Sequence, residues 1–210
     1  MQDYIREIYK LSSEDDRVST SALAARMQVA PPSATAMIKR LARMGLVEHE
    51  PYRGVVLTPS GTTIALELIR HHRLIEQYLA DSLGVPIEAV HAEADRLEHA
   101  LSEELEARID ELLGFPTHDP HGDPIPDAGL AVEQAELRSL ATLEPGEQAV
   151  VRRIPSDDAN LLRYLASLAL IPGKRVVLRS IAPFDGPITV RAEGIEHAIS
   201  RALALRISVA

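Results

Sequence analysis

The chain of 210 residues has no cysteine and no tryptophan, and it has only two phenylalanines and five tyrosines. Without cysteine it can form neither disulfides nor thiolate metal sites, which suits a reducing compartment. No apolar run approaches the roughly 20 residues that a membrane-spanning helix needs. The first residues, M-Q-D-Y-I-R-E-I-Y, lack the pattern of a signal peptide. We therefore expect a soluble, cytoplasmic protein with no membrane partner, and the many alanines and leucines favour helices.

Acidic residues outnumber basic ones, but the excess is confined to the middle of the chain. The net charge is −9; residues 66–128 carry 4 Lys/Arg against 15 Asp/Glu, whereas residues 1–65 carry 8 against 7 and residues 129–210 carry 10 against 9. Between positions 17 and 47 there are five basic residues and no acidic one. A locally basic segment suits contact with phosphates, and an acidic segment is unfavourable unless cations or ion pairs compensate it.

The first 65 residues have the pattern of a winged helix-turn-helix domain. N-cap candidates at 19–21 precede a short helix, and two prolines open a second helix, predicted at 33–44, which Gly45 ends. This second helix carries Arg43 among its basic residues. Two β-prone runs then flank residues 51–54 and predict a hairpin wing with Tyr52 and Arg53 at its tip. A small helical domain without a DNA role is the alternative, but the gathered basic residues favour DNA binding.

Six potential metal ligands lie on two neighbouring predicted helices of the acidic segment, the first from Ser60 to about 83 and the second from Val90 to about 113. Each set occupies one helical face, because the spacings are i, i+4 on the first helix and i, i+4, i+7, i+8 on the second. The residues are His72, Glu76, His91, Asp95, Glu98 and His99. A single His–Glu pair is usually a solvated ion pair. Six such residues in a segment of this charge favour a metal site, and ligands without sulfur lean toward the harder transition metals such as manganese.

No catalytic pattern accompanies these ligands. The H-E-x-x-H motif, a Ser/His/Asp order and a glycine-rich phosphate loop are all missing from the sequence. We therefore expect that the protein is not an enzyme. His118 and His121 lie in a segment rich in Pro and Gly, 114–129, and are interpreted as loop residues. Short β-prone runs after Leu143, with one helix at 159–168, predict a small β-barrel.

Six motifs connect residues 3–126 with a known family. They are D-Y-I-R-E-I-Y at 3–9, P-P-S-A-T-A-M-I-K-R-L at 31–41, G-L-V-E-H-E-P-Y-R-G-V-V-L-T at 45–58, H-R-L-I-E-Q-Y-L at 72–79, V-H-A-E-A-D-R-L-E-H-A-L-S at 90–102 and G-D-P-I-P at 122–126. The chain resembles the diphtheria toxin repressor family of metal-dependent transcriptional regulators, and at the ligand positions its manganese transport regulator-like branch.

The resemblance implies a mainly α fold with small β parts. It implies a winged helix-turn-helix DNA-binding domain at 1–65, a helical metal-binding and dimerisation domain at 66–128, a linker at 129–144 and an SH3-like (FeoA-like) β-barrel domain at 145–210. In the recognition-helix region it places Pro31, Pro32, Ser33, Thr35, Lys39 and Arg40.

Two metal sites are also implied by the resemblance. The regulatory site comprises Asp3, Asp95, Glu98 and His99, and the ancillary site comprises His72, Glu76, His91 and, from the C-terminal domain, Asp158. Iron-responsive members tend to have Met at the first and Cys at the second regulatory position, so two carboxylates there favour Mn²⁺ over Fe²⁺. Arg6 stands where the manganese branch has a further carboxylate, so a second cation bound through that carboxylate is not expected.

The expected function is repression of metal-ion uptake genes by a cytoplasmic homodimer that binds a pseudo-palindromic operator in double-stranded DNA, with Mn²⁺ as corepressor. Three alternatives stay open at this point. One is an Fe²⁺-dependent repressor of the same family. The others are a metal-dependent hydrolase with an accessory winged helix and a metal-buffering or structural module without a DNA role.

Overall fold

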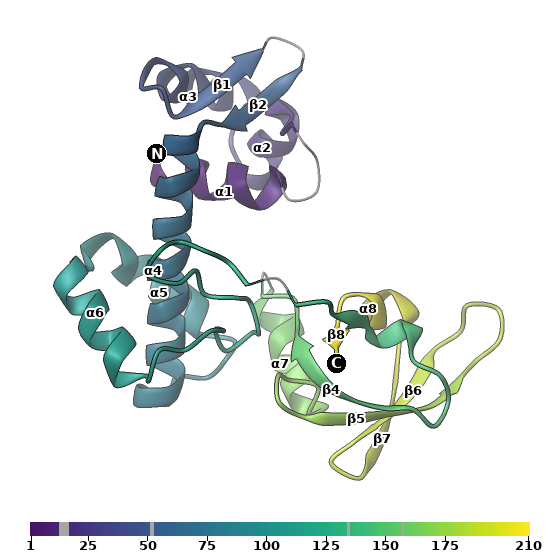
Figure 1. Cartoon of the computed structure of the whole chain (residues 1–210). Coiled ribbons are helices and arrows are strands. Elements are labelled where there is room, and N and C mark those ends of the chain that lie inside the picture. Colours follow the sequence, from purple (N-terminus) through teal and green to yellow (C-terminus); the bar gives the residue numbers. More distant parts are fainter. Residues whose placement is uncertain (13–16, 51–52, 134, 157) are drawn as a thin grey trace. The chain divides into compact units, whose positions relative to one another are not determined.

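The computed structural model describes residues 1–12, 17–50, 53–133, 135–156 and 158–210, which form two compact units. The first unit contains residues 1–71 with 126–131, and the second contains 72–125 with 132–210. The division falls within the long helix α4 (Pro59–Leu83), drawn in Figure 1. No helix in the described part of the chain combines the length and the apolar character that crossing a membrane would require.

The first unit is a winged helix-turn-helix. Its elements are α1 (Gln2–Ser12), α2 (Thr20–Arg26), α3 (Pro31–Arg43), the antiparallel strands β1 (Val47–Glu50) and β2 (Gly54–Leu57), and the start of α4. Ser19 caps α2 by accepting a hydrogen bond from the backbone N–H of Ala22. Helix α3 begins two residues earlier than predicted, because Pro31 occupies its first turn, where a missing N–H is tolerated. The predicted fold of this part is confirmed.

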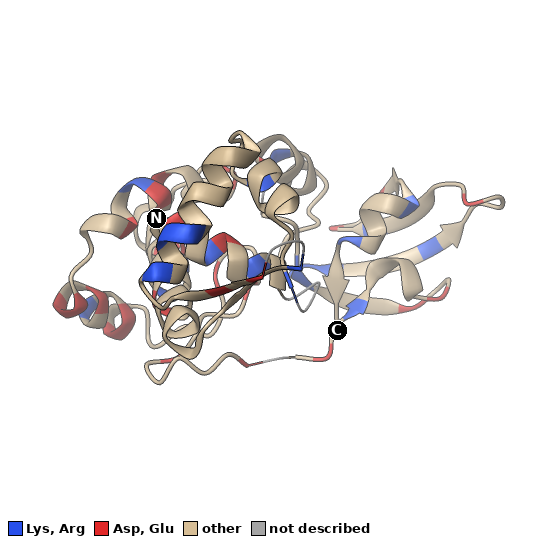
Figure 2. Ribbon diagram, turned by 90° about the horizontal axis from the view of Figure 1, so that it is seen from above, with Lys and Arg blue, Asp and Glu red and all other residues tan. Residues whose placement is uncertain are grey.

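The predicted single helix from Val90 to about 113 is wrong. The chain instead forms α5 (Val90–Leu97), a 3-10 turn η1 (Glu98–Ala100) and α6 (Glu103–Leu112). Leu101 is extended, and Ser102 caps α6 by accepting from the N–H of Leu105. Three glutamates in the first turn of α6 then interact favourably with the helix dipole. The acidic residues of α6 are red in Figure 2. A cap signal inside an apolar helical pattern therefore ends one helix and starts another.

The C-terminal part of the second unit is a six-stranded antiparallel sheet in the order β3-β8-β4-β5-β6-β7. Its strands are β3 (Arg138–Ser139), β4 (Gln148–Arg153), β5 (Arg175–Ile181), β6 (Ile188–Ala192), β7 (Ile195–Ile199) and β8 (Ser208–Val209). Helices α7 (Ala159–Ser167) and α8 (Arg201–Leu205) accompany it. The predicted SH3-like fold is confirmed, but among the described residues the strands form one open sheet with β3 and β7 at its edges, not the closed β-barrel that was predicted.

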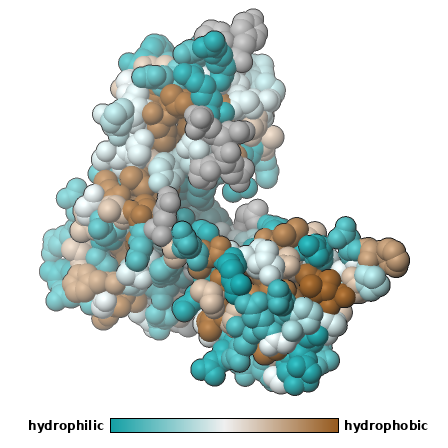
Figure 3. Space-filling view, turned by 45° about the vertical axis from the view of Figure 1, so that its right-hand side comes forward, coloured by the Kyte–Doolittle hydropathy of each residue, from teal (hydrophilic) through white to brown (hydrophobic). Residues whose placement is uncertain are grey.

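Two details of the C-terminal part differ from the sequence prediction. Leu140, Ala141 and Leu143 lie in the segment 129–144, predicted as a linker, but they are buried in the core of the sheet. The last of the β-prone runs predicted after Leu143, at 204–209, begins with the end of α8, because Ser200 caps this helix. Only its end forms a strand, β8. Elsewhere, Figure 3 shows mainly hydrophilic surface with smaller hydrophobic patches, which is ordinary for a folded protein.

An ion pair between a buried carboxylate and an exposed arginine joins α1 to α2 in the first unit. Glu7, only 8% exposed, accepts a hydrogen bond of 2.8 Å from Arg26 Nε and lies 3.5 Å from Lys10 Nζ. Burial alone would raise the pKa of the Glu7 carboxyl, but the charge of Lys10 and the hydrogen bond from Arg26 hold it below its ordinary value of 4.5. Since the folded state lowers this pKa, the ionised carboxylate stabilises the unit above pH 4.5, and the stabilisation is lost as the pH falls below that value.

We expect Glu7→Gln to lower the free energy of unfolding at pH 7 by about 1–2 kcal/mol, because a charge-assisted hydrogen bond is weakened. The difference from wild type should shrink when the pH is lowered below 4.5. Hydrogen exchange of the α1 and α2 amides measures this unit by itself. The matched control is Glu48→Gln in the same unit, because Glu48 on β1 is exposed and its charge should matter little. Equal destabilisation by both variants would contradict the assignment.

Candidate metal centre and DNA-binding surface

Three of the predicted ancillary ligands are in contact in the second unit. His72 and Glu76 lie one turn apart on α4, and His91 lies on α5. Glu76 Oε1 lies 2.9 Å from both His72 Nε2 and His91 Nδ1, and these two nitrogens are also 2.9 Å apart. The helical spacing of four residues places the first two side chains on one face, and α5 supplies the third. The predicted grouping is thus observed as a compact cluster.

The other nitrogen of His72 reaches the residues predicted for the regulatory site. His72 Nδ1 lies 2.5 Å from Glu98 Oε2 and 3.5 Å from Asp95 Oδ1. Both Glu98 and His72 are 4% exposed, whereas Asp95 is partly exposed. The two predicted ligand sets are therefore not separate within this unit, since one imidazole ring contacts members of both.

The buried carboxylates change the protonation of their neighbours. Burial alone would lower the pKa of His72, but the hydrogen bonds to Glu76 and Glu98 outweigh it and raise this pKa to about 9. Burial alone would raise the pKa of Glu76, but the neighbouring histidines hold it well below its ordinary value. In the protein without a cation, a proton on His72 therefore compensates the carboxylates, and a cation bound there would compete with that proton.

The remaining three predicted ligands belong to three different elements. His99 follows Glu98 in η1, and its Nε2 is 3.8 Å from Glu98 Oε1. Asp3 lies in the first turn of α1, in the other compact unit. Asp158 is exposed and caps α7, where its Oδ1 accepts from the N–H groups of the second and third residues that follow it. The assignments of all three to metal sites remain predictions.

A second cluster, which the sequence interpretation missed, lies beside the first. His121 was interpreted as a loop residue, but it is fully buried, and it forms a group of possible metal ligands with Glu76 and Asp119. His121 Nε2 lies 3.1 Å from the carbonyl oxygen of Ile87. A carbonyl only accepts hydrogen bonds, so Nε2 carries the proton and orients the ring. We call Glu76, Asp119 and His121 the His121 cluster.

The donor atoms of the His121 cluster fit a divalent cation. His121 Nδ1 is buried without a hydrogen-bond partner among the described residues, and it lies 3.7 Å from Glu76 Oε2 and 3.9 Å from Asp119 Oδ1. Ligand atoms each about 2 Å from one cation lie about 3–4 Å apart. Burial, with the charges of Asp123 and Glu76, raises the pKa of Asp119 to about 7. A cation would relieve this accumulation of buried negative charge.

One sequence signal points to this cluster. Asp119 and His121 are two residues apart and flank Pro120, in a stretch of Pro, Gly and Asp. An Asp followed two residues later by a potential ligand can form an Asx turn, and here the His121 N–H does donate to Asp119 Oδ1. The composition alone marks an ordinary surface loop, so burial was the missing information.

The predicted DNA-binding residues lie mostly on the exposed face of α3. Pro31, Pro32, Ser33, Lys39, Arg40 and Arg43 are exposed there. Thr35 is half-buried, and its hydroxyl donates to the Pro31 carbonyl. In the wing, Arg53 pairs with Glu50 at 3.3 Å, and the predicted contact residue Tyr52 lies outside the described residues. An exposed basic face on the second helix of the motif is the arrangement that major-groove readers use.

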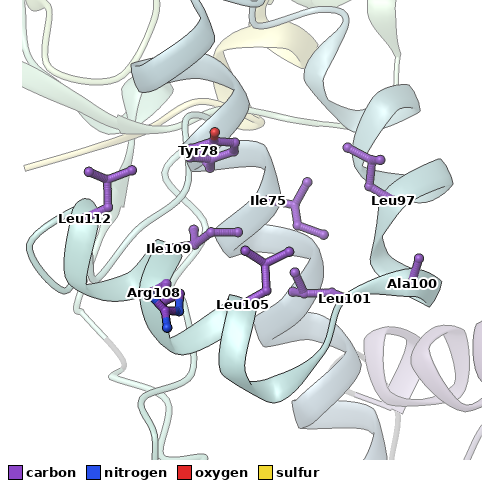
Figure 4. A pocket seen from close by; sticks show the side chains of 9 residues that line it. All are labelled: Ile75, Tyr78, Leu97, Ala100, Leu101, Leu105, Arg108, Ile109 and Leu112. Atoms are coloured by element: carbon purple, nitrogen blue, oxygen red, sulfur yellow. The ribbon is translucent and has the colours of Figure 1, made fainter.

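An apolar groove of about 370 Å³ lies between α4, α5 and α6 (Figure 4). Side chains from all three helices line it: Ile75, Tyr78, Leu97, Ala100, Leu101, Leu105, Arg108, Ile109 and Leu112. Leu97, Leu105 and Leu112 are 47%, 49% and 67% exposed. Several large apolar side chains exposed around one groove are typical of an interaction surface.

Family comparisons cover nearly the whole chain. Residues 1–55 match the N-terminal DNA-binding domain of iron-dependent repressors, and residues 58–127 match their metal-binding and dimerisation domain. Residues 138–210 match the FeoA domain. The His121 cluster and the apolar groove both lie within the metal-binding and dimerisation match.

Individual relatives agree with these matches. The diphtheria toxin repressor of Corynebacterium efficiens is 40% identical over 93% of this chain and 92% of that protein. The iron-dependent repressor IdeR of Mycobacterium leprae is 34% identical over 84% of this chain and 82% of that protein. Among solved structures, a manganese-dependent transcriptional repressor in complex with manganese gives a TM-score of 0.87 at 39% identity, covering 99% of this chain and 98% of that chain. The structure of ScaR with bound Zn²⁺ gives a TM-score of 0.82 at 30% identity, covering 100% of this chain and 98% of that chain. Since the DNA-binding domain, the metal-binding and dimerisation domain and the FeoA domain all match, and a relative is 40% identical over most of both chains, the chain belongs to the iron-dependent repressor family that includes the diphtheria toxin repressors.

Proposed function

We propose that this chain, a metal-dependent DNA-binding repressor by family, uses Mn²⁺ as its corepressor. The observation that carries the proposal is the buried centre of imidazole and carboxylate groups around Glu76, which contains no sulfur donor. Donors of this kind suit Mn²⁺ better than soft thiolate-binding metals. The similarity to a manganese-dependent repressor that contains manganese supports the same choice. Since the family consists of repressors, the hydrolase alternative falls away.

Two cation positions are proposed. The regulatory position uses Asp3, Asp95, Glu98 and His99, as the family resemblance implies. The ancillary position is centred on Glu76, with His72 and His91 on one side of its carboxylate and the remaining members of the His121 cluster on the other. Asp158 stays a further candidate for the ancillary position, although in the described structure it caps α7.

The proposed regulation follows from where the regulatory ligands lie in the sequence. Asp3 belongs to the DNA-binding unit, and the other three ligands belong to the metal-binding and dimerisation domain. When bound, a divalent cation supplies the positive charge that lets these carboxylates approach one another. Ligands drawn from both parts then favour the arrangement in which the winged helices match two half-sites. This works only if the DNA-competent state binds the cation more tightly than other states do.

The proposed DNA target is a pseudo-palindromic operator of metal-ion uptake genes, bound in the cytoplasm by a homodimer. Its two half-sites would mirror the two-fold symmetry of the dimer. On α3, the basic side chains and Ser33 would hold phosphates, and base readout would rest on apolar contacts with thymine methyls and on DNA shape. We assign the groove between α4, α5 and α6 to the dimer interface, because it is apolar and lies in the metal-binding and dimerisation domain.

Removing regulatory carboxylates tests the metal switch. Mn²⁺ should strengthen wild-type binding to DNA from the gene's own upstream region by about 5- to 150-fold. The double variant Asp95→Ala with Glu98→Ala should lose this stimulation in mobility-shift assays, because two ligands are gone. The control variant Glu103→Ala with Glu111→Ala removes two exposed carboxylates of α6 and should respond to Mn²⁺ like wild type. Stimulation that survives in the first variant would refute the regulatory site.

The choice of metal needs a separate comparison, because relatives named iron-dependent make Fe²⁺ the second candidate. We expect Mn²⁺ to give half-maximal operator binding at a lower free concentration than Fe²⁺ does. Mobility shifts at buffered free metal, under anaerobic conditions and with a chelator as blank, measure both values. A lower half-maximal concentration for Fe²⁺ would favour the iron-dependent repressor.

The dimer assignment predicts the effect of a charge in the groove. Leu105→Glu places a carboxylate among the apolar side chains of Figure 4 and should convert the dimer to a monomer at micromolar concentration in sedimentation experiments. Leu205→Glu is the matched control, since Leu205 is similarly exposed, at 56%, but lies on α8. A dimer that persists in Leu105→Glu would place the interface elsewhere.

A further inference from the structure

The loop that carries Asp119 and His121 is held by its own hydrogen bonds. Asp119 Oδ1 accepts from the backbone N–H groups of His121 and Asp123, at 2.9 Å each. On the side of α4, Arg73 donates to the carbonyl of Pro124, and its Nε lies 3.8 Å from Asp119 Oδ2. These contacts define the shape of the loop 119–124.

The end of β4, in the C-terminal sheet, holds the opposite side of the same loop. The Ile154 N–H donates to the His121 carbonyl at 2.9 Å, and Arg153 Nη1 lies 3.6 Å from Asp123 Oδ1. In the first contact the acceptor is the backbone carbonyl of His121, which is a member of the His121 cluster. The position of the His121 backbone therefore depends on where β4 lies, while the ring is oriented by the Ile87 carbonyl.

Gly122 allows the backbone of β4 to lie close to the loop 119–124. Its φ is +87°, and a Cβ at this position would lie 1.8 Å from the Arg152 carbonyl oxygen and 2.9 Å from Arg153 Cα. Any side chain would therefore push β4 away from the loop. Gly146, just before β4, provides a comparison, since its φ is +93° but no described atom lies within 4 Å of its Cβ position. Both glycines have a left-handed backbone, and only Gly122 has a close neighbour.

We propose that the C-terminal sheet positions the metal ligands of the His121 cluster through the contact of β4 with Gly122. Gly122 is thus a positioning residue, and cation binding at the cluster is coupled to docking of the sheet. The proposal rests on the proposed function in one respect, that the cluster binds a cation. Coupling is reciprocal, so a bound cation also stabilises the contact between β4 and the loop. This gives the FeoA-like domain a positioning role at the cluster through the backbone of β4.

Calorimetric titration of the full chain with Mn²⁺ tests the proposal. His121→Ala identifies which part of the binding isotherm belongs to the cluster. Gly122→Ala should weaken that part by about 10- to 100-fold, the usual effect of losing an outer-shell support. Gly146→Ala introduces the same backbone strain without the clash and should bind Mn²⁺ like wild type.

Hydrogen exchange gives a readout that requires no glycine variant. Mn²⁺ should slow amide exchange at the end of β4, including Ile154, in wild type and not in His121→Ala. If Gly122→Ala fails to fold, this measurement decides, and unchanged exchange at β4 on Mn²⁺ binding would overturn the coupling.

The outcomes distinguish failure of the positioning role of Gly122 from failure of the cation site at the His121 cluster. Wild-type Mn²⁺ binding by Gly122→Ala, together with a loss in His121→Ala, would overturn the positioning role while leaving the cation site intact. An unchanged isotherm in His121→Ala would refute the site itself, and the inference would fall with it.

Discussion

The compensation of buried negative charge governs the arrangement of the second unit. Glu76 is only 2% exposed, and a carboxylate removed from water needs partners of opposite charge or strong donors. Its partners come from three parts of the chain, with His72 on α4, His91 on α5 and His121 in the loop before the C-terminal sheet. The helices and the loop must therefore meet at one point, and a centre that takes a proton or a cation is the result.

Local patterns were enough to predict the parts whose geometry is local. His72 and Glu76 share a helical face because they are four residues apart, and this held whatever packed against them. The winged helix was predictable for the same reason, since caps, prolines and turn residues mark its boundaries within a few positions. Family resemblance then supplied a prediction that spacing cannot make, the grouping of Asp3 with Asp95.

Long-range burial was the information that the sequence did not contain. His121 resembles a surface loop residue until β4 covers it, and β4 lies more than 25 residues further along the chain. The break before α6 was missed for the opposite reason. Ser102 is a strong local cap, but the helical apolar pattern on both sides of it suggested continuity. Asp158 illustrates a third difference between prediction and structure. Its side chain was predicted to bind a metal, but in the structure it caps α7.

The absence of sulfur from the centre has a consequence for the conditions in which the protein can work. A thiolate ligand is oxidised stepwise by peroxide, and some of these products cannot be reversed. The imidazole and carboxylate groups around Glu76 undergo no such stepwise oxidation, and the chain has no cysteine that could form a disulfide across them. Peroxide therefore cannot inactivate this centre by the thiol oxidation that disables thiolate sites.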